Sequence, residues 1–328
     1  MASLDDIIPF VKLIVGLVLL SGGADYLIRG AVAVANRLNI SPLVVGLTVV
    51  ALGTSLPELV VCVRAAMTGA AGIAVGNVVG SNIANILFIL GAGALVFPVT
   101  ANRAHFLRDS SILLGATAIF VGIALTGAFT FLPGLVMVAL LFLFLGVSYV
   151  KGKKHGAADL SLIDIDEVSE EKPVAAVLAS VWILGGLIAV AFGADLLVDG
   201  ATTIARELGV TEEVIGLTMV AVGTSLPELA TVVAAAARKH TDLVVGNVMG
   251  SNIFNILGVM GVTSMVADIP VTPQILSFDI WFMVATAVVL VPFMLTGNVI
   301  SRREGAMCLV LYVAYIGIQY VGVDRVLS

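Results

Sequence analysis

The sequence GLTVVALGTSLPEL at residues 46–59 returns almost unchanged as GLTMVAVGTSLPEL at residues 216–229. A second segment, VGNVVGSNIANIL at residues 75–87, returns as VGNVMGSNIFNIL at residues 245–257. Both matches share an offset of 170 residues. Segments of this length do not recur at one common offset by chance, so the chain is an internal duplication.

The composition places this duplicated chain in a membrane. Of its 328 residues, 60% are hydrophobic and 12% are charged, against about 45–50% and about 25% in a typical soluble domain. A soluble protein could not bury so much apolar surface, so we expect an integral membrane protein in contact with the lipid bilayer. The net charge of −6 argues against a nucleic-acid partner, and the two cysteines argue against a disulfide scaffold.

Ten apolar segments are long enough to span a bilayer as helices, which takes roughly 20 residues each. They cover residues 7–36, 42–69, 73–97, 104–125, 131–150, 173–206, 211–239, 241–266, 273–296 and 303–324. The polar stretch 151–172 separates the first five from the last five, and we interpret it as a solvated linker. The prediction is an all-α membrane protein with five-helix repeats at 1–150 and 173–328.

Since five is an odd number, the second repeat is expected to enter the membrane in the opposite sense from the first, as in the inverted repeats of secondary transporters. Lysine and arginine accumulate on the cytoplasmic side. With both termini outside, the basic residues divide 12 to 4 between the cytoplasmic and outer ends. The cytoplasmic set is Arg29, Arg37, Arg103, Arg108, Lys151, Lys153, Lys154, Lys172, Arg238, Lys239, Arg302 and Arg303, and the outer set is Lys12, Arg64, Arg206 and Arg325. This predicts a multi-pass cell-membrane protein with a cytoplasmic 151–172 loop.

Each GTSLPE segment lies in the middle of an apolar span. Its proline removes a backbone donor and clashes with the preceding turn, and its glycine loosens the helix further. We therefore expect broken second and seventh helices, with unpaired carbonyls near Ala51 and Gly53 and near Ala221 and Gly223. Irregular backbone at membrane depth is tolerated where it is buried in protein or lines a cavity. A plain proline kink that only shapes helix packing is the alternative.

The two segments also place carboxylates near the middle of the membrane. Glu58 and Glu228 lie there without a lysine or arginine at comparable depth. An unpaired carboxylate at that depth costs at least a few kcal/mol, so its partner must be a proton, hydrogen bonds or a mobile cation. Thr54 and Thr224 precede the glutamates by four residues and share their side of the helix. Ser55 and Ser225 add further oxygens.

The second repeated segment supplies a complementary polar stripe. Asn77, Ser81 and Asn85 recur every four residues and so share one face of a helix, and Asn247, Ser251 and Asn255 repeat the pattern. Interhelical hydrogen bonding, or close packing through the neighbouring glycines, is the alternative role for this stripe. Together the two segments offer only oxygen ligands, which suit Ca²⁺ and Na⁺ and do not suit Zn²⁺ or Cu.

The other polar residues suggest no second chemistry. The three histidines, His105, His155 and His240, fall at loops or span ends, and the sequence has no nucleotide-binding motif. Two aspartate pairs also obey the duplication, Asp25 with Asp195 and Asp109 with Asp279. We expect these to lie near span ends or to join helices by hydrogen bonds, with direct ion binding as the alternative.

In the two repeated segments the sequence resembles the sodium/calcium exchangers of the cation/calcium antiporter superfamily, and the resemblance covers the whole chain. It implies that the broken second and seventh helices, with the third and eighth, enclose cation positions at mid-membrane. On this chain the implied Ca²⁺ ligands are the carboxylates of Glu58 and Glu228 and the carbonyls of Thr54 and Thr224. The implied Na⁺ ligands add Ala51, Ser55, Ser81, Asn85, Ala221, Ser225, Ser251 and Asn255. Potassium-dependent relatives carry aspartate where this chain has Asn255.

The predicted function is therefore secondary antiport of Na⁺ against Ca²⁺, and the resemblance implies about three Na⁺ per Ca²⁺ by alternating access. A Ca²⁺/H⁺ antiporter of the same superfamily is the main alternative, although such relatives tend to carry GNAxE-type segments in place of GTSLPE. A cation channel would build its pore around an oligomer axis, whereas this chain forms its own pseudo-symmetric site as a monomer. An enzyme would need a nucleophile–base pair, and none is visible. No cofactor is expected.

Overall fold

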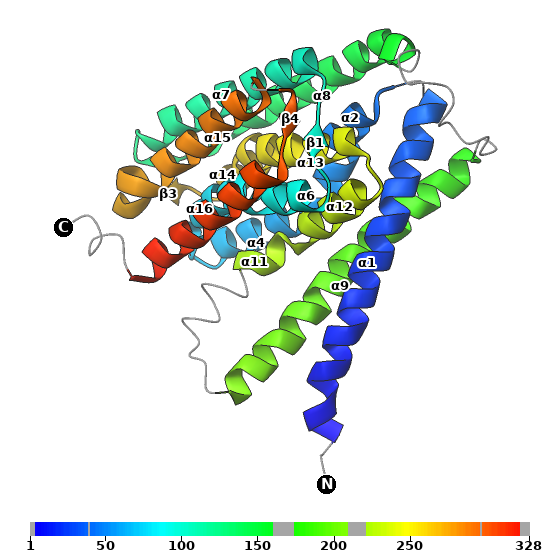
Figure 1. Cartoon of the computed structure of the whole chain (residues 1–328). Coiled ribbons are helices and arrows are strands. Elements are labelled where there is room, and N and C mark those ends of the chain that lie inside the picture. Colours follow the sequence, from blue (N-terminus) through cyan, green and yellow to red (C-terminus); the bar gives the residue numbers. More distant parts are fainter. Residues whose placement is uncertain (1–3, 39, 160–173, 209–220, 296, 322–328) are drawn as a thin grey trace.

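The computed structural model describes residues 4–38, 40–159, 174–208, 221–295 and 297–321, which form a bundle of helices (Figure 1). The first half contains α1 (Leu4–Leu38), α2 (Pro42–Val45), η1 (Gly46–Val50), α3 (Ala51–Thr54), α4 (Leu56–Met67), α5 (Ala71–Ala84), η2 (Asn85–Ile89), α6 (Leu90–Val96), β1 (Val99–Thr100), α7 (Arg103–Ala124), β2 (Ala128–Phe129) and α8 (Phe131–Asp159). The second contains α9 (Ala176–Glu207), α11 (Ala221–Thr224), α12 (Leu226–Ala237), α13 (Thr241–Ile253), η5 (Phe254–Met260), α14 (Gly261–Val266), β3 (Ile269–Pro270), η6 (Ile275–Asp279), α15 (Ile280–Leu295), β4 (Val299–Ile300) and α16 (Arg302–Val321). The segments labelled η are π-helical turns.

The protein is an all-helical multi-pass membrane protein. Within the described residues, eight helices are long and apolar enough to cross a membrane, and the bent pair Pro42–Thr54 and Leu56–Met67 makes a ninth span. The predicted seventh span, 211–239, is described only from Ala221 onward, as α11 and α12, and its first ten residues lie outside the described part. The exact ten-helix inverted repeat therefore stays a prediction.

The predicted linker begins later than expected. The fifth helix does not end near residue 150 but continues as α8 to Asp159, because the sequence KGKKHGAAD contains lysines and alanines that favour helix. Residues 160–172 of the predicted linker lie outside the described part of the chain. The boundary at residue 150 between the first repeat and the linker therefore falls inside a helix.

The helices form an inner group and an outer group. The most apolar stretch of Thr241–Val266, which contains α13, is buried throughout, and that of Ala71–Val96, which contains α5, is 72% buried. The corresponding stretch of Arg302–Val321 is only 17% buried, so α16 faces outward. Figure 1 shows α7, α8, α15 and α16 over one side of this centre, with α1 and α9 on the other. The most buried helices are therefore those that carry the repeated polar segments.

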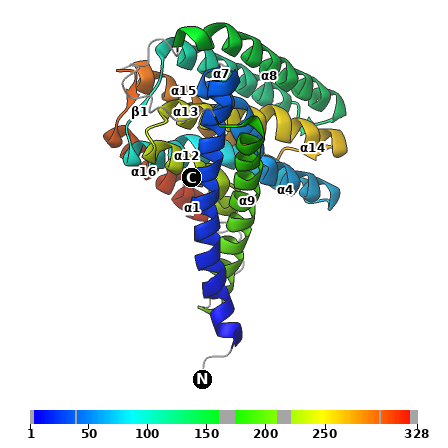
Figure 2. The ribbon, with the colours of Figure 1, turned by 90° about the vertical axis from the view of Figure 1, so that its right-hand side faces the viewer.

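The long helices α1 and α9 pack side by side and antiparallel, as both views show (Figures 1 and 2). Gly16 of α1 faces Gly193 of α9, and Gly23 faces Gly186, so the contact runs in opposite directions along the two helices. A Cβ on Gly16 would lie 2.8 Å from the Gly193 carbonyl oxygen, which leaves no room for a side chain. Small residues of this kind let transmembrane helices approach at backbone distance.

Two short antiparallel strand pairs join the halves of the chain. In the first, β1 pairs with β4 so that Val99 lies opposite Ile300, and in the second β2 pairs with β3 so that Ala128 lies opposite Pro270. Each pair takes one strand from each half of the sequence. The halves are therefore joined by backbone hydrogen bonds outside the helical core.

Candidate cation site

Both GTSLPE segments break their helices, as predicted. Ser55 lies between α3 and α4 with φ −87° and ψ 7°, and the helices on either side of it are bent by 42°. Ser225 has nearly the same conformation, φ −95° and ψ 4°, between α11 and α12. Pro57 and Pro227 lie in the first turn of the helices that follow, where a missing N–H costs nothing.

The breaks place the glutamates at helix starts. Glu58 lies in the first turn of α4 and Glu228 in the first turn of α12. The first N–H groups of a helix point toward this position, and the helix dipole favours negative charge there. The N-terminal ends of α4 and α12 therefore partly stabilise the negative charge of the two carboxylates.

The expectation of unpaired carbonyls is wrong for Ala51. Its oxygen accepts a hydrogen bond from the Ser55 N–H at 3.0 Å, and the Thr54 hydroxyl lies 3.4 Å from the same oxygen. The last turn of α3 is therefore closed, and the helix breaks after it at Ser55. The carbonyl of Gly53 loses its usual helical donor, because residue 57 is a proline. Gly223 has the same relation to Pro227, while the carbonyl of Ala221, the first residue of α11, stays a prediction.

The two carboxylates are buried, and each has only 1% of its residue surface exposed. The Ser55 hydroxyl donates a hydrogen bond of 2.9 Å to Oε1 of Glu228. Oε2 of Glu58 and Oε2 of Glu228 have no hydrogen-bond partner within the described part of the chain. The ion pairs found there join other residues, and none contains either glutamate. No lysine or arginine among the described residues therefore balances the charge of these carboxylates.

Threonine–asparagine contacts link each break to the other half of the chain. The hydroxyl of Thr54 lies 3.4 Å from Oδ1 of Asn247, and the hydroxyl of Thr224 lies 3.5 Å from Oδ1 of Asn77. Both asparagines belong to the predicted stripe, but neither is among the ligands implied by the resemblance. Each asparagine is the first of three polar residues that recur every four positions, and this spacing placed it on the same helix face as the implied ligands.

The rest of the stripe lies on buried helices around the breaks. Ser81 is on α5 and Ser251 on α13, while Asn85 begins η2 and Asn255 lies in η5. Single π-helical turns such as η2 and η5 are frequent at functional sites. Neither serine is hydrogen-bonded to a carboxylate among the described residues. The stripe and the two glutamates therefore share one buried core, but no hydrogen bond joins these serines to the glutamates.

Several polar atoms in this core lack hydrogen-bond partners among the described residues. They are the Ser225 and Ser251 hydroxyls, Oδ1 of Asn85, Nδ2 of Asn247 and both amide atoms of Asn255. Nδ2 of Asn85 does donate to Oδ1 of Asn252, at 3.4 Å, and sequence analysis had not singled out Asn252. A buried polar atom without a partner costs about 1–3 kcal/mol. A cation held among such oxygens would recover part of that cost.

Three of the four repeated aspartates, Asp25, Asp109 and Asp279, make contacts with other residues of the bundle. Asp25 forms ion pairs with Arg29 and Arg238, and Asp109 pairs with Arg108 at 2.8 Å. Asp279 accepts hydrogen bonds from Tyr315 at 3.1 Å and from Gln319. Within the described residues, no three His, Cys, Asp or Glu side chains lie close enough to hold a metal ion together. A cation between Glu58 and Glu228 would thus rely on neutral oxygens for its other ligands.

A cavity of about 330 Å³ reaches the stripe from the side of α16. One wall is α5, with Gly76, Asn77, Gly80 and Ser81, and the opposite wall includes Asp279. A Cβ built on Gly76 or Gly80 would meet no atom within 4 Å, so the two glycines leave this space open. The cavity therefore reaches Asn77 and Ser81, two residues of the predicted stripe.

Comparison with known proteins gives consistent matches along the chain. The profile of the family described as sodium/calcium exchanger protein matches residues 8–150 and 178–321. Sodium/calcium exchanger MaX1 of Methanosarcina acetivorans is 33% identical over 341 residues, covering 94% of this chain and 97% of its own. Inner membrane protein YrbG of Escherichia coli is 34% identical over 280 residues, covering 84% and 86%. Among solved structures, the sodium-calcium exchanger NCX_Mj superposes with a TM-score of 0.81 at 32% identity, covering 95% of this chain and 98% of that one.

Proposed function

Because this chain belongs to the sodium/calcium exchanger family of the cation/calcium antiporter superfamily, we propose that it exchanges about three Na⁺ for one Ca²⁺ at a mid-membrane site between its two repeats. Members of this family are transporters and not enzymes. The observation that carries the proposal is the pair of buried carboxylates, Glu58 and Glu228, that lack a basic partner among the described residues and lie within a core of neutral oxygens.

Shared ligands couple the two ions. Ca²⁺ takes carboxylate and carbonyl oxygens, here from Glu58, Glu228, Thr54 and Thr224, and Na⁺ accepts the same types of oxygen. The Na⁺ ligands are the carboxylates with the neutral groups at Ala51, Ser55, Ser81, Asn85, Ala221, Ser225, Ser251 and Asn255. Since both ions need the same glutamates, Ca²⁺ and a full load of Na⁺ cannot bind together, and each displaces the other.

The hydroxyl groups favour Na⁺ over H⁺ as the counter-ion. Ser55 and Ser225 lie at the two breaks, and the Ser225 hydroxyl has no hydrogen-bond partner within the described residues. A proton needs only one carboxylate oxygen, so a proton-coupled site gains nothing from further oxygens. The family assignment also does not favour the Ca²⁺/H⁺ alternative.

Alternating access between the two repeats completes the proposal. The antiparallel contact of α1 with α9, and the contacts that Thr54 and Thr224 make with asparagines of the opposite half, support inverted repeats around one site. Rocking of one repeat against the other exposes such a site to opposite sides of the membrane in turn. Both termini are proposed to lie outside and residues 151–172, which include the end of α8, inside, and one copy of the chain contains the whole site.

The charge on the site differs between its two loaded states. One Ca²⁺ neutralises two ionised glutamates, whereas three Na⁺ leave about one positive charge. Moving that charge through the membrane potential is worth about 2.3 kcal/mol per 100 mV, which is more than a tenfold change in an equilibrium. Exchange is therefore proposed to be electrogenic.

Ca²⁺ uptake into proteoliposomes tests the proposal. An imposed Na⁺ gradient should drive uptake, and a potential set with valinomycin should change its rate and extent. Uptake that follows the Na⁺ gradient but ignores the potential would contradict the stoichiometry and leave the ion pair intact. Uptake driven by a pH gradient and indifferent to Na⁺ would refute Na⁺ coupling itself.

A further inference from the structure

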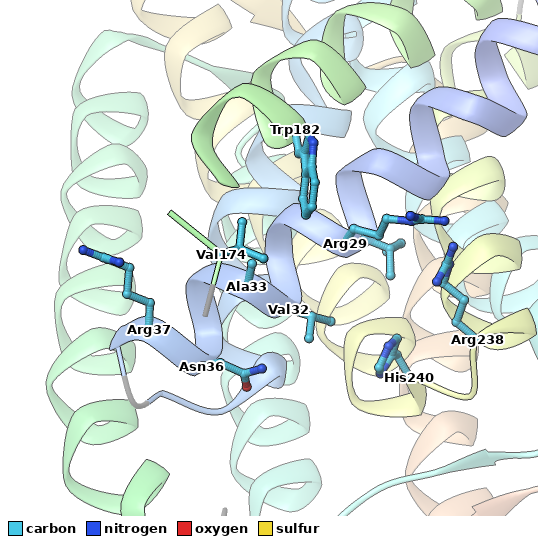
Figure 3. A pocket seen from close by; sticks show the side chains of 10 residues that line it. Arg29, Val32, Ala33, Asn36, Arg37, Val174, Trp182, Arg238 and His240 are labelled. Carbon is cyan, nitrogen blue, oxygen red and sulfur yellow. The ribbon is translucent and has the colours of Figure 1, made fainter. Parts of the chain in front are cut away.

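A second cavity, of about 430 Å³, lies at the C-terminal end of α1 (Figure 3). Arg29 and Arg37 of α1, Trp182 of α9, and Arg238 and His240 from the connection between α12 and α13 contribute to its walls. Among the described residues that line it there is no Asp or Glu and none of the candidate ion ligands. Three arginines in this lining favour an anion.

Two of these arginines are positioned by one carboxylate. Arg29 Nε lies 3.0 Å from Oδ2 of Asp25, and Arg238 bonds to Oδ1 of the same side chain. Figure 3 shows the side chains of Arg29 and Arg238 close to each other, with His240 below Arg238, while Arg37 lies further along α1 and points away. Two guanidinium groups on one carboxylate leave a net positive charge. Their remaining N–H donors match a phosphate group.

His240 adds a polar group without adding charge. Burial, followed by the nearby charge of Arg238, lowers the pKa of this histidine below its usual value. A neutral imidazole beside Arg238 can donate one hydrogen bond to a phosphate oxygen. This part of the cavity therefore offers donors from α1 and from the connection between α12 and α13.

An apolar groove of about 360 Å³ meets the basic cavity at Trp182, which lines both. The groove runs between α1 and α9 and is lined by residues such as Val18, Leu19 and Val181. Gly22 and Gly185 also line it, and a Cβ built on either would meet no atom within 4 Å. A ligand that fills both spaces must carry an anionic group at one end and an apolar chain at the other.

Aromatic residues mark the junction between the two spaces. The rings of Tyr26 and Trp182 lie 6.4 Å apart, and the guanidinium carbon of Arg29 lies 5.9 Å from the Tyr26 ring centre. Tyrosine and tryptophan concentrate where a membrane meets water, at the depth of the lipid head groups. The basic cavity therefore lies at head-group depth and the groove extends toward the hydrocarbon.

The duplication does not account for the arginines. The residues 170 positions after Arg29 and Arg37 are Asp199 and Glu207, so the corresponding end of α9 is acidic. Asp199 there pairs with Lys12 at 2.5 Å. The basic cavity thus occurs at one end of the α1–α9 pair, the end that we expect to be cytoplasmic. Anionic lipids are enriched in that leaflet, and basic pockets between transmembrane helices bind their head groups.

We propose that the cavity and the groove together bind one anionic phospholipid, with its phosphate between Arg29 and Arg238 and an acyl chain in the groove that follows the α1–α9 contact. A soluble phosphate would use the cavity alone and leave the groove without a role. A zwitterionic lipid would bring a positive group to a site that already carries positive charge. The ligand is thus defined by both its charge and its chain.

Lipid titration of the purified full-length protein in detergent, read by native mass spectrometry, tests the proposal. One phosphatidylglycerol should bind per chain, at least tenfold more tightly than phosphatidylcholine. The double variant Arg29→Gln/Arg238→Gln should lose this preference, whereas Arg303→Gln, an exposed arginine outside the cavity, should keep it. Equal affinity for the two lipids in the unmodified protein, or an unchanged preference in the double variant, would overturn the proposal.

A groove variant separates a lipid from a free phosphate. Gly185→Leu places a side chain in the groove and leaves Arg29 and Arg238 in place, so it should weaken phosphatidylglycerol binding about as much as the double variant. Inorganic phosphate should compete only weakly with the lipid. Displacement of the lipid by low concentrations of phosphate, together with normal lipid binding in Gly185→Leu, would identify a soluble-anion site instead. If the double variant aggregates, Gly185→Leu and the comparison of the two lipids still decide the matter.

Discussion

Ser55 of the first half donates a hydrogen bond of 2.9 Å to the carboxylate of Glu228 in the second half. Thr54 and Thr224 likewise reach asparagines of the opposite half, at 3.4 and 3.5 Å. Neither helix break is completed by its own repeat. Any cation that draws Glu228 toward itself must therefore also move or release Ser55, which couples the two breaks mechanically.

We expect Glu58→Gln and Glu228→Gln each to abolish Ca²⁺ transport while the protein still folds. Each substitution keeps the size of the side chain and removes one of the two charges. Removing one partner of a buried charge pair costs about 3–5 kcal/mol, and 3 kcal/mol already exceeds a hundredfold in affinity. Ca²⁺ uptake by reconstituted variants measures the effect, and thermal stability in detergent checks the fold.

Glu207→Gln is the matched control for this experiment, because Glu207 is an exposed carboxylate at the end of α9. Its transport should equal that of the unmodified protein. If instead a Glu58 or Glu228 variant exchanged normally, or lost stability in proportion to its activity, these carboxylates would be structural.

Side chains introduced at Gly80 should obstruct ion access in order of their size. A Cβ at this position meets open space in the 330 Å³ cavity next to Ser81, so alanine should be tolerated and leucine should slow exchange severalfold or more. Gly122→Leu on the exposed side of α7 is the control, since a Cβ there also meets nothing. Initial rates of Na⁺-driven Ca²⁺ uptake measure the effect. Equal rates for the leucine variants at Gly80 and Gly122 would exclude the cavity as the route.

Transport should not require K⁺. Asn255 provides a neutral amide where potassium-dependent relatives provide a carboxylate, so the site has less negative charge with which to hold another cation. Ca²⁺ uptake at a fixed Na⁺ gradient and clamped voltage should be the same with K⁺ or choline outside. A strong rise with K⁺ would show that the amide does not decide this property.

Cysteine labelling should place residues 160–172 on the cytoplasmic side and both termini outside. Lys172→Cys should react only in inside-out vesicles, and a cysteine at Ser328 should react in intact cells, after Cys62 and Cys308 are replaced by alanine. The basic residues at the predicted cytoplasmic ends are the reason for this orientation. External labelling of Lys172→Cys would reverse the topology.

The sequence was most informative where backbone chemistry is local. Pro57 and Pro227 predicted the two helix breaks, because a proline within an apolar helix leaves few other conformations. The proline alone also suggested that the Ala51 carbonyl lacks a hydrogen-bond donor, which is wrong. The Ser55 N–H donates to this carbonyl, because of the backbone conformation at Ser55. The end of α8 at Asp159 was missed because charged residues near a helix end are compatible with both helix and linker.

Contacts between distant segments were harder to predict. The pairing of Thr54 with Asn247 and of Thr224 with Asn77 follows from how four helices meet, and the spacing within each helix gives only the face involved. The antiparallel contact of α1 with α9 depends on Gly16 and Gly23. Their seven-residue spacing is visible in the sequence, but it does not indicate which helix packs against them.

The reciprocal contacts across the 170-residue offset have an evolutionary consequence. A chain with one repeat would leave Gly16, Gly23 and its helix break without their partners, and only a second copy inserted upside down could supply them. Under the proposed inverted topology, two separate copies of one repeat would have to insert in both directions in similar amounts, which requires little charge difference between their ends. The contrast between Arg29 in α1 and Asp199 in α9 is a charge difference that a single duplicated chain can carry, because one chain holds both orientations at a one-to-one ratio.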